Sequence, residues 1–220
     1  MKYTLITEPL YDYLVQHGNN ADPLLAELAK ETESLGPISM MQITPEQGTL
    51  MALLARAIGA RSAVEIGTFT GYSSLSVARA LGPEGRLLCC DISEEWTSIA
   101  RRYWAKAGVA DRIELRLGPA TETLAALPAN HQFDFAFVDA DKVSYRAYYD
   151  ALLPRMRPNG LVIFDNVLWQ GQVLDRSTPS DDTRALQALN DFIATDSRVQ
   201  AVMINVSDGL TIVRKKAAGE

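Results

Sequence analysis

Cysteine is nearly absent from the sequence. The two cysteines, Cys89 and Cys90, are neighbours within the apolar run "RLLCCD". Side chains that follow one another on a strand point to opposite faces of the sheet, so this pair argues against a disulfide framework. We expect two buried free thiols, which suit a reducing cytosol, and we therefore predict a cytoplasmic protein.

Long apolar runs and clusters of basic residues are also missing. The start of the chain, "MKYTLITEPLYDYL", is interrupted by Thr, Glu, Pro and Asp within a few residues, unlike a signal peptide. No apolar run is long enough to span a bilayer. The formal net charge is -6, and without a Lys/Arg-rich run this argues against a nucleic-acid surface. We expect neither a membrane nor a nucleic-acid partner.

No internal repeat, low-complexity tract or Pro/Gly/Ser-rich linker divides the chain. Its 220 residues fit one domain, 1–220. The first forty residues differ from the rest, because residues 7–18 and 22–36 each start at a capping residue and stop at a glycine, as helices do. Residues 44–60 predict a further helix. We expect residues 1–40 to form an N-terminal helical segment of this domain that acts as a lid or as a dimer contact.

From Arg61 onward, apolar strands alternate with helical stretches, which is typical of βαβ units and a parallel sheet covered on both faces. The expected strands are 62–66, 86–91, 112–117, 133–139 and 160–165. The expected helices are 72–80, 94–106, 120–127, 145–156 and, roughly, 181–195. Two final strands, 199–206 and 210–215, flank the turn signal "SDG" and predict an antiparallel hairpin. The fold class is therefore α/β, a mostly parallel sheet that ends in a hairpin.

Acidic residues stand at the carboxyl ends of four expected strands. They are Glu65, Asp91, Asp139 and Asp165. Any one of them could simply cap the following helix, but four together would repel one another if nothing bound there. Ligands of open α/β sheets bind beyond these strand ends, so we predict the binding site at this edge.

The loop after the first strand, "EIGTFTGYSS", resembles a nucleotide-binding glycine loop. A dinucleotide site uses G-x-G-x-x-G to receive a pyrophosphate, whereas here Gly67 and Gly71 are spaced G-x-x-x-G. Glu65 stands two residues before Gly67, where an anion is awkward beside a pyrophosphate but suits a cationic ligand. Asp91 can accept hydrogen bonds from both hydroxyls of a ribose. A cationic adenosyl cofactor without phosphate, S-adenosylmethionine, satisfies both constraints.

Four stretches then point to one family. "EIGTFTGYSSL", "FDFAFVDADK", "FDNVLWQGQV" and "DGLTIVRK" resemble the cation-dependent O-methyltransferases of the caffeoyl-CoA and catechol type, and most of all their small bacterial members. The resemblance runs from about "MQITPEQG" to the C-terminus. It implies a Rossmann-like class I methyltransferase fold with a seven-stranded sheet, a small vicinal dihydroxy-phenolic acceptor and a homodimer.

The resemblance also implies a metal ion held by Asp139, Asp165 and Asn166. An all-oxygen set favours hard cations, Mg²⁺ first and Ca²⁺ or Mn²⁺ as alternatives, over Zn²⁺. The two histidines, His17 and His131, lie outside the "DADK" and "DN" segments. The competing interpretation of "DN" is an Asx-turn after a strand.

Lys142 would stand beside the reacting hydroxyl, as the general base or as an electrostatic guide. An unperturbed phenol has a pKa of about 10 and is a poor nucleophile at neutral pH, so a base and a cation are both useful. Asp139 would bind the metal and border the cofactor, and Asp141 would face the cofactor. A solvated lysine at a helix start is the alternative for Lys142.

The remaining positions follow from matching motif to motif. The resemblance places the cofactor against Ile43, Glu65, Gly67, Thr68, Ser73, Asp91, Ala120, Asp139, Asp141 and Tyr148. Ile43 departs from the hydroxyl residue that many relatives carry, and Tyr148 could equally be a packing residue. Trp169 would border the acceptor or pack in the core. Gln170 replaces an asparagine of plant relatives, which puts a plant-like coenzyme A ester specificity in doubt. The N-terminal helices, with Tyr11 and Tyr13, would close over the site or form a dimer contact.

Two other functions remain open at this point. An NAD-dependent oxidoreductase on a doubly wound sheet would need the third glycine that the loop lacks. A non-catalytic binding module of the same fold would have no reason to keep Asp139, Lys142, Asp165 and Asn166, because unused charges destabilise an empty site.

Overall fold

The computed structural model describes residues 4–18, 22–177 and 179–220. Its strands form one seven-stranded sheet in the order β3-β2-β1-β4-β5-β7-β6. The strands are β1 Ser62–Ile66, β2 Arg86–Asp91, β3 Ile113–Leu117, β4 Phe133–Val138, β5 Met156–Phe164, β6 Val199–Ile204 and β7 Leu210–Lys215. Strands β1 to β5 pair in parallel, and β7 pairs antiparallel with both β5 and β6. The predicted parallel sheet with a closing hairpin is confirmed.

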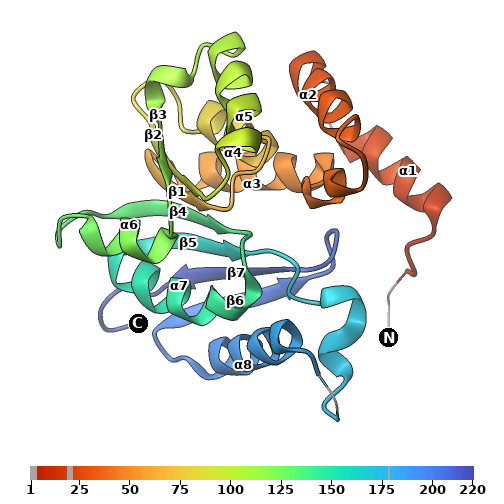
Figure 1. The fold of residues 1–220 in the computed structure, drawn as a ribbon. Helices are drawn as coiled ribbons and strands as arrows, with labels where there is room; N and C mark the ends of the chain where they lie inside the picture. Colours follow the sequence, from red (N-terminus) through yellow and green to blue (C-terminus); the bar gives the residue numbers. More distant parts are fainter. Residues whose placement is uncertain (1–3, 19–21, 178) are drawn as a thin grey trace.

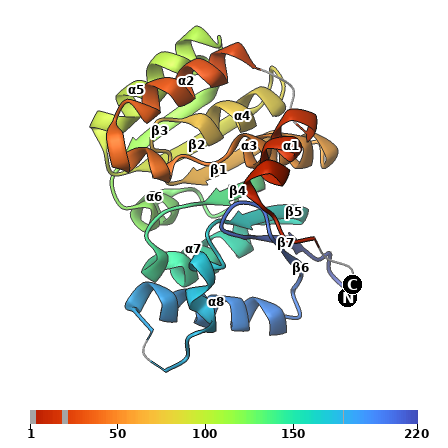
Figure 2. The same ribbon diagram turned by 90° about the vertical axis from the view of Figure 1, so that its right-hand side faces the viewer.

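Helices cover both faces of this sheet (Figures 1 and 2). One face carries α3 Pro45–Ala57, α4 Tyr72–Ala80 and α5 Glu94–Lys106, and the other carries α6 Ala120–Ala126, α7 Tyr145–Leu152 and α8 Asp181–Thr195. Cys89 belongs to the first core and Cys90 to the second, and both are buried and free. The strand alternation expected for these neighbours is therefore confirmed.

The expected helix 145–156 is wrong at its end. Helix α7 stops at Leu152, a 3-10 turn η4 covers Leu153–Arg155, and Met156 already belongs to β5, where it pairs with Phe133. Pro154 explains the stop, because its ring clashes with the preceding turn and it lacks an N–H. Strand β5 therefore starts four residues earlier than the expected Gly160.

The N-terminal helices α1 Glu8–Gly18 and α2 Pro23–Glu33 differ in how they attach to the fold. Helix α2 is held against α4 and α5 by ion pairs, among them Lys106–Glu27 at 2.5 Å. Its Thr32 hydroxyl donates to Thr70 Oγ1 at 2.8 Å, and both side chains are buried. Helix α1 has no buried residue and lies at the border of the molecule beside α3 (Figures 1 and 2).

Shorter 3-10 segments complete the chain. They are η1 Gly36–Met41, η2 Ala110–Arg112, η3 Lys142–Ser144 and η5 Trp169–Leu174. Two of them, η3 and η5, begin a few residues after the ends of β4 and β5, where the binding site is predicted. Within the described residues, no helix is both long enough and apolar enough to cross a membrane.

Candidate active site

The carboxyl ends of β1, β4 and β5 lie side by side and are joined by backbone hydrogen bonds. The Asp139 N–H donates to the Ile66 carbonyl at 2.8 Å, and the Asp165 N–H donates to the Val138 carbonyl at 3.0 Å. The first residue after β4 is thus hydrogen-bonded to the end of β1, and the first residue after β5 is hydrogen-bonded to the end of β4. The structure therefore brings the glycine loop and both predicted metal-binding aspartates to one edge of the sheet.

Gly67 lies where two of these strand ends nearly touch. Its φ is +88°, and a Cβ atom built on it would lie 1.9 Å from the Asp139 carbonyl oxygen. Only glycine fits this position, because a side chain would meet backbone atoms that cannot move aside. The loop therefore needs Gly67 for the approach of β1 to β4, whatever ligand it binds.

We expect Gly67→Ala to lower the free energy of unfolding by roughly 3–5 kcal/mol, because it adds a backbone clash to an unfavourable φ. Gly59→Ala is the matched control, since Gly59 also has a positive φ, +62°, but nothing lies within 4 Å of its Cβ position. Urea unfolding of both variants measures the difference. Equal stability of the two variants would contradict the close approach.

Glu65 is a buried carboxyl at the end of β1, only 1% exposed. Its Oε2 and the hydroxyl of Thr68 are both buried and have no hydrogen-bond partner among the described residues. Burial raises the pKa of Glu65 to about 8. Ser73, also buried, follows in the first turn of α4. Unsatisfied acceptors in a buried loop fit a ligand that donates hydrogen bonds and carries positive charge.

This raised pKa predicts how stability depends on pH. The folded-state pKa lies above the unfolded value of 4.5, so the folded protein holds a proton that the unfolded chain releases, and stability falls as pH rises from about 4.5 to 8. We expect Glu65→Gln to stabilise the ligand-free protein by up to about 5 kcal/mol at pH 9 and by little near pH 4. Urea unfolding across this range is the measurement. If the unfolding free energies of the variant and the wild type differ by the same amount at every pH, Glu65 is not a buried carboxyl that titrates in this range.

Asp91 holds the glycine loop in shape. Its Oδ2 accepts from the backbone N–H groups of Thr68 and Phe69 at 2.8 and 2.9 Å, and its Oδ1 accepts from the Ser93 N–H at 2.8 Å. The capping role open to any strand-end aspartate is thus present here. A carboxylate has about four acceptor positions, and three of those on the half-buried Asp91 are used, so one position on Oδ1 remains for a ribose hydroxyl.

The other predicted cofactor residues lie on both sides of the sheet edge. Tyr148, on α7, packs in the core and donates its hydroxyl to Asp141 Oδ1 at 2.6 Å, while its contact with a cofactor stays a prediction. Ala120 starts α6 in the same core as Tyr148, whereas Ile43 packs in the core of the opposite face. A cofactor that touched all of them would span the carboxyl end of the sheet.

Lys142 is buried beside the two aspartates and is only 7% exposed. Its Nζ donates to Asp139 Oδ1 at 3.0 Å and to the Tyr145 hydroxyl at 2.7 Å. Tyr145 donates in turn to the carbonyls of Val138 and Asp165, at 3.2 and 3.1 Å. Burial raises the pKa of Tyr145 well above its usual range, so this hydroxyl stays neutral. The solvated lysine considered from the sequence is therefore wrong.

Asp165 is held at both carboxylate oxygens and is 2% exposed. The backbone N–H of Asn166 donates to Oδ1 at 2.7 Å, and the side-chain amide of Gln47 donates to Oδ2 at 2.8 Å. Burial, followed by the charge of Asp139, raises the pKa of Asp165 to about 7. Asn166 itself has a left-handed φ of +54°, a strain typical of functional loops. An Asx-turn would bind the N–H two residues on, but the N–H groups of Val167 and Leu168 donate to the Gly209 and Asp208 carbonyls instead, so the Asx-turn interpretation of "DN" is wrong.

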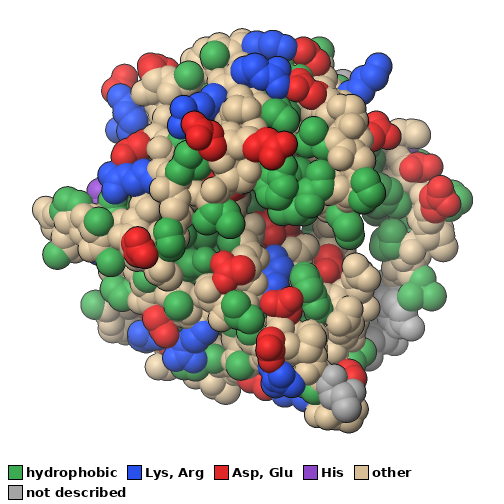
Figure 3. Space-filling view, viewed as in Figure 1, with side chains coloured by type: hydrophobic (Ala, Val, Ile, Leu, Met, Phe, Trp, Pro, Cys, Tyr) green, Lys and Arg blue, Asp and Glu red, His purple; other side chains and the backbone are tan. Residues whose placement is uncertain are grey.

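Trp169 and Gln170 share this strained loop, with φ of +49° and +51°. Lys142 Nζ lies 5.7 Å from the centre of the Trp169 ring, so the structure places Trp169 beside the predicted reaction centre. Gln170 is exposed, and its backbone N–H donates to Asp208 Oδ1 at 2.7 Å. On the face of the molecule seen in Figure 1, the space-filling view of Figure 3 shows a hollow in which one basic side chain lies among acidic and apolar ones.

Within the described part of the chain, no group of three or more His, Cys, Asp or Glu side chains could hold a metal. The predicted set contains only two carboxylates, Asp139 and Asp165, and completes its ligands with the amide oxygen of Asn166. It therefore fits an oxygen-binding cation that takes its other ligands from water or substrate.

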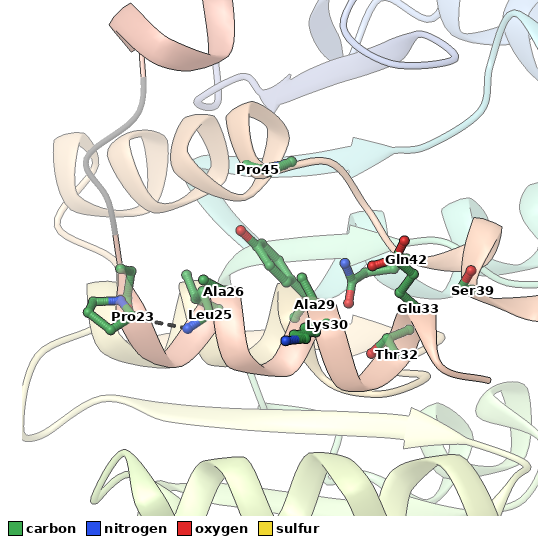
Figure 4. Close-up of a pocket in the computed structure, with 12 residues that line it drawn as sticks. Pro23, Leu25, Ala26, Ala29, Lys30, Thr32, Glu33, Ser39, Gln42 and Pro45 are labelled. Carbon is green, nitrogen blue, oxygen red and sulfur yellow. Dashed lines mark hydrogen bonds between the residues drawn. The ribbon is translucent and has the colours of Figure 1, made fainter. Parts of the chain in front are cut away.

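A cavity of about 730 Å³ lies along α2 (Figure 4). Its walls include Gln42 and Pro45, which flank the Ile43 segment, and Tyr72 of the glycine-loop helix. None of Asp139, Lys142 and Asp165 lines it. None of the predicted cofactor residues is among its lining residues either, so the cavity does not mark the predicted site.

Sequence reasoning missed Gln47 and Tyr145 as partners of the site. Gln47 is 118 residues away from Asp165, and no local pattern links the two. Tyr145 had a signal, because it lies one 3-10 turn after Lys142 at the start of a helix, where a side chain can return to the strand end.

Comparisons with known proteins give a consistent result. A family model described as "O-methyltransferase" matches residues 15–216. A protein named probable caffeoyl-CoA O-methyltransferase 1, from Dictyostelium discoideum, is 37% identical over 210 residues, covering 94% of this chain and 91% of that protein. The catechol O-methyltransferase domain-containing protein 1 of Mus musculus is 39% identical over 211 residues, covering 94% of this chain and 80% of its own.

Solved structures show the same fold. The O-methyltransferase TomG from Streptomyces achromogenes, determined in complex with SAM, has a TM-score of 0.86 at 32% identity and covers 94% of this chain and 95% of its own. An O-methyltransferase from Bacillus cereus, in complex with SAH, has a TM-score of 0.85 at 31% identity, with coverage of 93% and 96%.

Proposed function

Because the chain belongs to the O-methyltransferase family and is an S-adenosylmethionine-dependent methyltransferase, we propose that it methylates one hydroxyl of a vicinal dihydroxy aromatic compound with the help of a divalent cation. The acceptor class is a catechol, caffeoyl or flavonoid type of molecule, and Mg²⁺ is the first choice of cation. The NAD-dependent alternative does not agree with this family and is set aside.

One observation carries the proposal. A buried lysine, Lys142, is fixed at 3.0 Å from Asp139 in the same cluster as Asp165, beside the glycine loop. Such a cluster costs folding free energy unless it is used. Its mixture of two carboxylates, one amide and one amine fits a cation and a proton acceptor placed next to each other.

Asp139, Asp165 and Asn166 would hold the cation. Asp165 uses one acceptor position on each oxygen for Asn166 and Gln47, so further positions remain for a metal ion. When bound, a hard cation supplies Lewis acidity that lowers the pKa of an acceptor hydroxyl.

The cofactor would lie over the glycine loop, with Glu65 facing its positive charge and Asp91 its ribose. Gly67, Thr68, Ser73, Ala120, Asp141, Tyr148 and Ile43 complete the proposed contacts. When bound, S-adenosylmethionine supplies an electrophilic methyl group on a cationic sulfur. The unsatisfied oxygens of Glu65 and Thr68 support this placement.

The protein's own groups then do two things to the acceptor. Trp169 forms one wall that orients the ring, with exposed Gln170 at the rim. Lys142 stands beside one hydroxyl, either as its general base or as a positive charge that guides it, and the deprotonated oxygen takes the methyl group from the sulfur of the cofactor. Holding both reactants in line accounts for much of the rate enhancement in such transfers.

The test is methyl transfer from labelled S-adenosylmethionine to a panel of catechols, caffeic-type acids and flavonoids, with Mg²⁺ and with excess EDTA. We expect labelled monomethyl products that disappear with EDTA. Full activity in EDTA would refute the cation, and labelling of no acceptor would favour the non-catalytic binding module.

We further propose a cytoplasmic homodimer, with α1 at the contact. Helix α1 has no buried residue and exposes Tyr13 and Leu14, while Tyr11 ties it to α3 through a 3.1 Å hydrogen bond to Glu46. The buried free cysteines support a reducing compartment.

We expect light scattering to give twice the chain mass of 24.1 kDa for the wild type and a monomer for a Leu14→Glu variant, because a charge in an apolar contact opposes association. Val202→Glu, at an exposed position on β6, is the control and should stay dimeric. A monomeric wild type at micromolar concentration would contradict the dimer.

A further inference from the structure

Gln47 joins α3 to the end of β5 through one buried contact. It lies in the first turn of α3, is 0% exposed, and donates from Nε2 to Asp165 Oδ2 at 2.8 Å. The carboxylate cannot donate a hydrogen bond while it is ionised, so the amide must present its nitrogen to Asp165. The contact therefore has a defined direction.

The close packing of α3 fixes where this amide lies. The next residue, Gly48, lets α3 approach α4, because a Cβ atom there would lie 3.0 Å from both Ser76 Oγ and a ring carbon of Tyr72. Pro45 at the start of the helix fixes the backbone just before it. Gln47 thus projects from rigid backbone, which is what a precise contact to a ligand-binding side chain needs.

The contact completes a two-point hold on Asp165. The Asn166 N–H binds one carboxylate oxygen and the Gln47 amide binds the other, so the plane of the carboxylate is set from opposite sides. Without Gln47, Oδ2 would lose the donor that opposes rotation of this buried group.

A neutral donor is the only kind that suits this position. The cluster already contains the cation Lys142 and the anions Asp139 and Asp165. A lysine at position 47 would compete with a metal ion for Asp165, and a glutamate would repel it. The amide oxygen of Gln47, Oε1, is buried and has no hydrogen-bond partner among the described residues. Burying this unpaired oxygen costs folding free energy, which the hydrogen bond from Nε2 to Asp165 must offset.

We propose that Gln47 is a positioning residue that orients Asp165 for the divalent cation and thereby sets the affinity of the site for metal. This inference rests on the proposed function, in which Asp165 is a ligand. Groups that orient metal ligands typically change metal affinity by about 10–100-fold when they are replaced.

The experiment titrates the full-length protein with Mn²⁺ as the probe and follows free Mn²⁺ by electron paramagnetic resonance. Gln47→Met keeps the length of the side chain and removes the donor. Tyr149→Phe is the matched control, because it removes a hydroxyl that donates to another carboxylate, Asp196, at 2.8 Å and away from the site. Asp165→Asn reports on the metal site itself, and S-adenosylhomocysteine binding to each variant reports on the cofactor side.

We expect Gln47→Met to weaken Mn²⁺ binding by about 10–100-fold with unchanged S-adenosylhomocysteine affinity, while Tyr149→Phe leaves both unchanged. Wild-type Mn²⁺ affinity in Gln47→Met, or an equal loss of Mn²⁺ and S-adenosylhomocysteine binding, would overturn the positioning role. If Asp165→Asn also binds Mn²⁺ like the wild type, the proposed metal site fails rather than the role of Gln47 alone.

Discussion

Replacing Asp165 by asparagine is expected to lower methyl transfer by at least about 10³-fold, while the ligand-free protein keeps its stability or gains some at pH 8. The lost activity follows from the lost cation, whose charge stabilisation is worth several kcal/mol, and each 1.36 kcal/mol is tenfold in rate. The retained stability follows from burial: Asp165 is 2% exposed, and its pKa is raised to about 7 by burial and by Asp139. An ionised carboxylate at this buried position lowers the stability of the ligand-free protein.

The measurement pairs the labelled methyl-transfer assay with thermal unfolding in EDTA at pH 8. Asp150→Asn is the control, because Asp150 is an exposed carboxylate in a surface ion pair with Arg146 and should affect neither readout. Asp165→Asn with more than a tenth of wild-type turnover would argue against a metal ligand. A large fall in its melting temperature would instead identify Asp165 as a structural residue.

A carboxylate at the opposite end of the sheet shows the contrast. Partial burial tends to raise the pKa of Asp134, but the N–H groups of Arg61 and Ser62 and the guanidinium of Arg157 outweigh it and hold the pKa below its usual value. Asp134 therefore stabilises the fold above its unfolded pKa, and this contribution is lost as pH falls. Asp165 has the opposite sign, because its ionised form opposes the folding of the ligand-free protein.

The elements predicted most accurately are those whose signals are local. Helices α4 and α5 begin and end at the expected residues, 72–80 and 94–106, because Gly71 and Gly82 flank α4 and Ser93 caps the start of α5. The strands are short apolar runs between such helices. Local signals failed at residues 153–156, where Pro154 breaks a pattern that otherwise continues as a helix.

The site was partly predictable for a different reason. Parallel strands place their carboxyl ends at one edge, so acids such as Asp139 and Asp165, which follow two strands, were expected together without knowledge of their distance. The contacts of Gln47 with Asp165 and of Thr32 with Thr70 cross 118 and 38 residues. They depend on how α3 and α2 pack, which no single stretch of sequence determines.

Substitution of Lys142 decides between its two proposed roles, general base and electrostatic guide. Lys142→Met removes both the base and the charge, and we expect a loss of turnover of about 10²–10⁴-fold. Lys142→Arg keeps a positive charge beside Asp139, but an arginine stays protonated in proteins and cannot accept a proton. If Lys142 is the base, the arginine variant is as inactive as the methionine variant.

The hydrogen bonds of Lys142 allow the methionine and arginine variants to be compared directly. Its Nζ is fixed by Asp139 and the Tyr145 hydroxyl, which leaves one N–H position of the ammonium, or the lone pair of the neutral amine, for the acceptor. Turnover is measured at saturating cofactor and Mg²⁺, with S-adenosylhomocysteine binding as the check that the site is intact. Near wild-type turnover in Lys142→Arg would assign the lysine an electrostatic role. Water would then have to accept the proton of the acceptor hydroxyl.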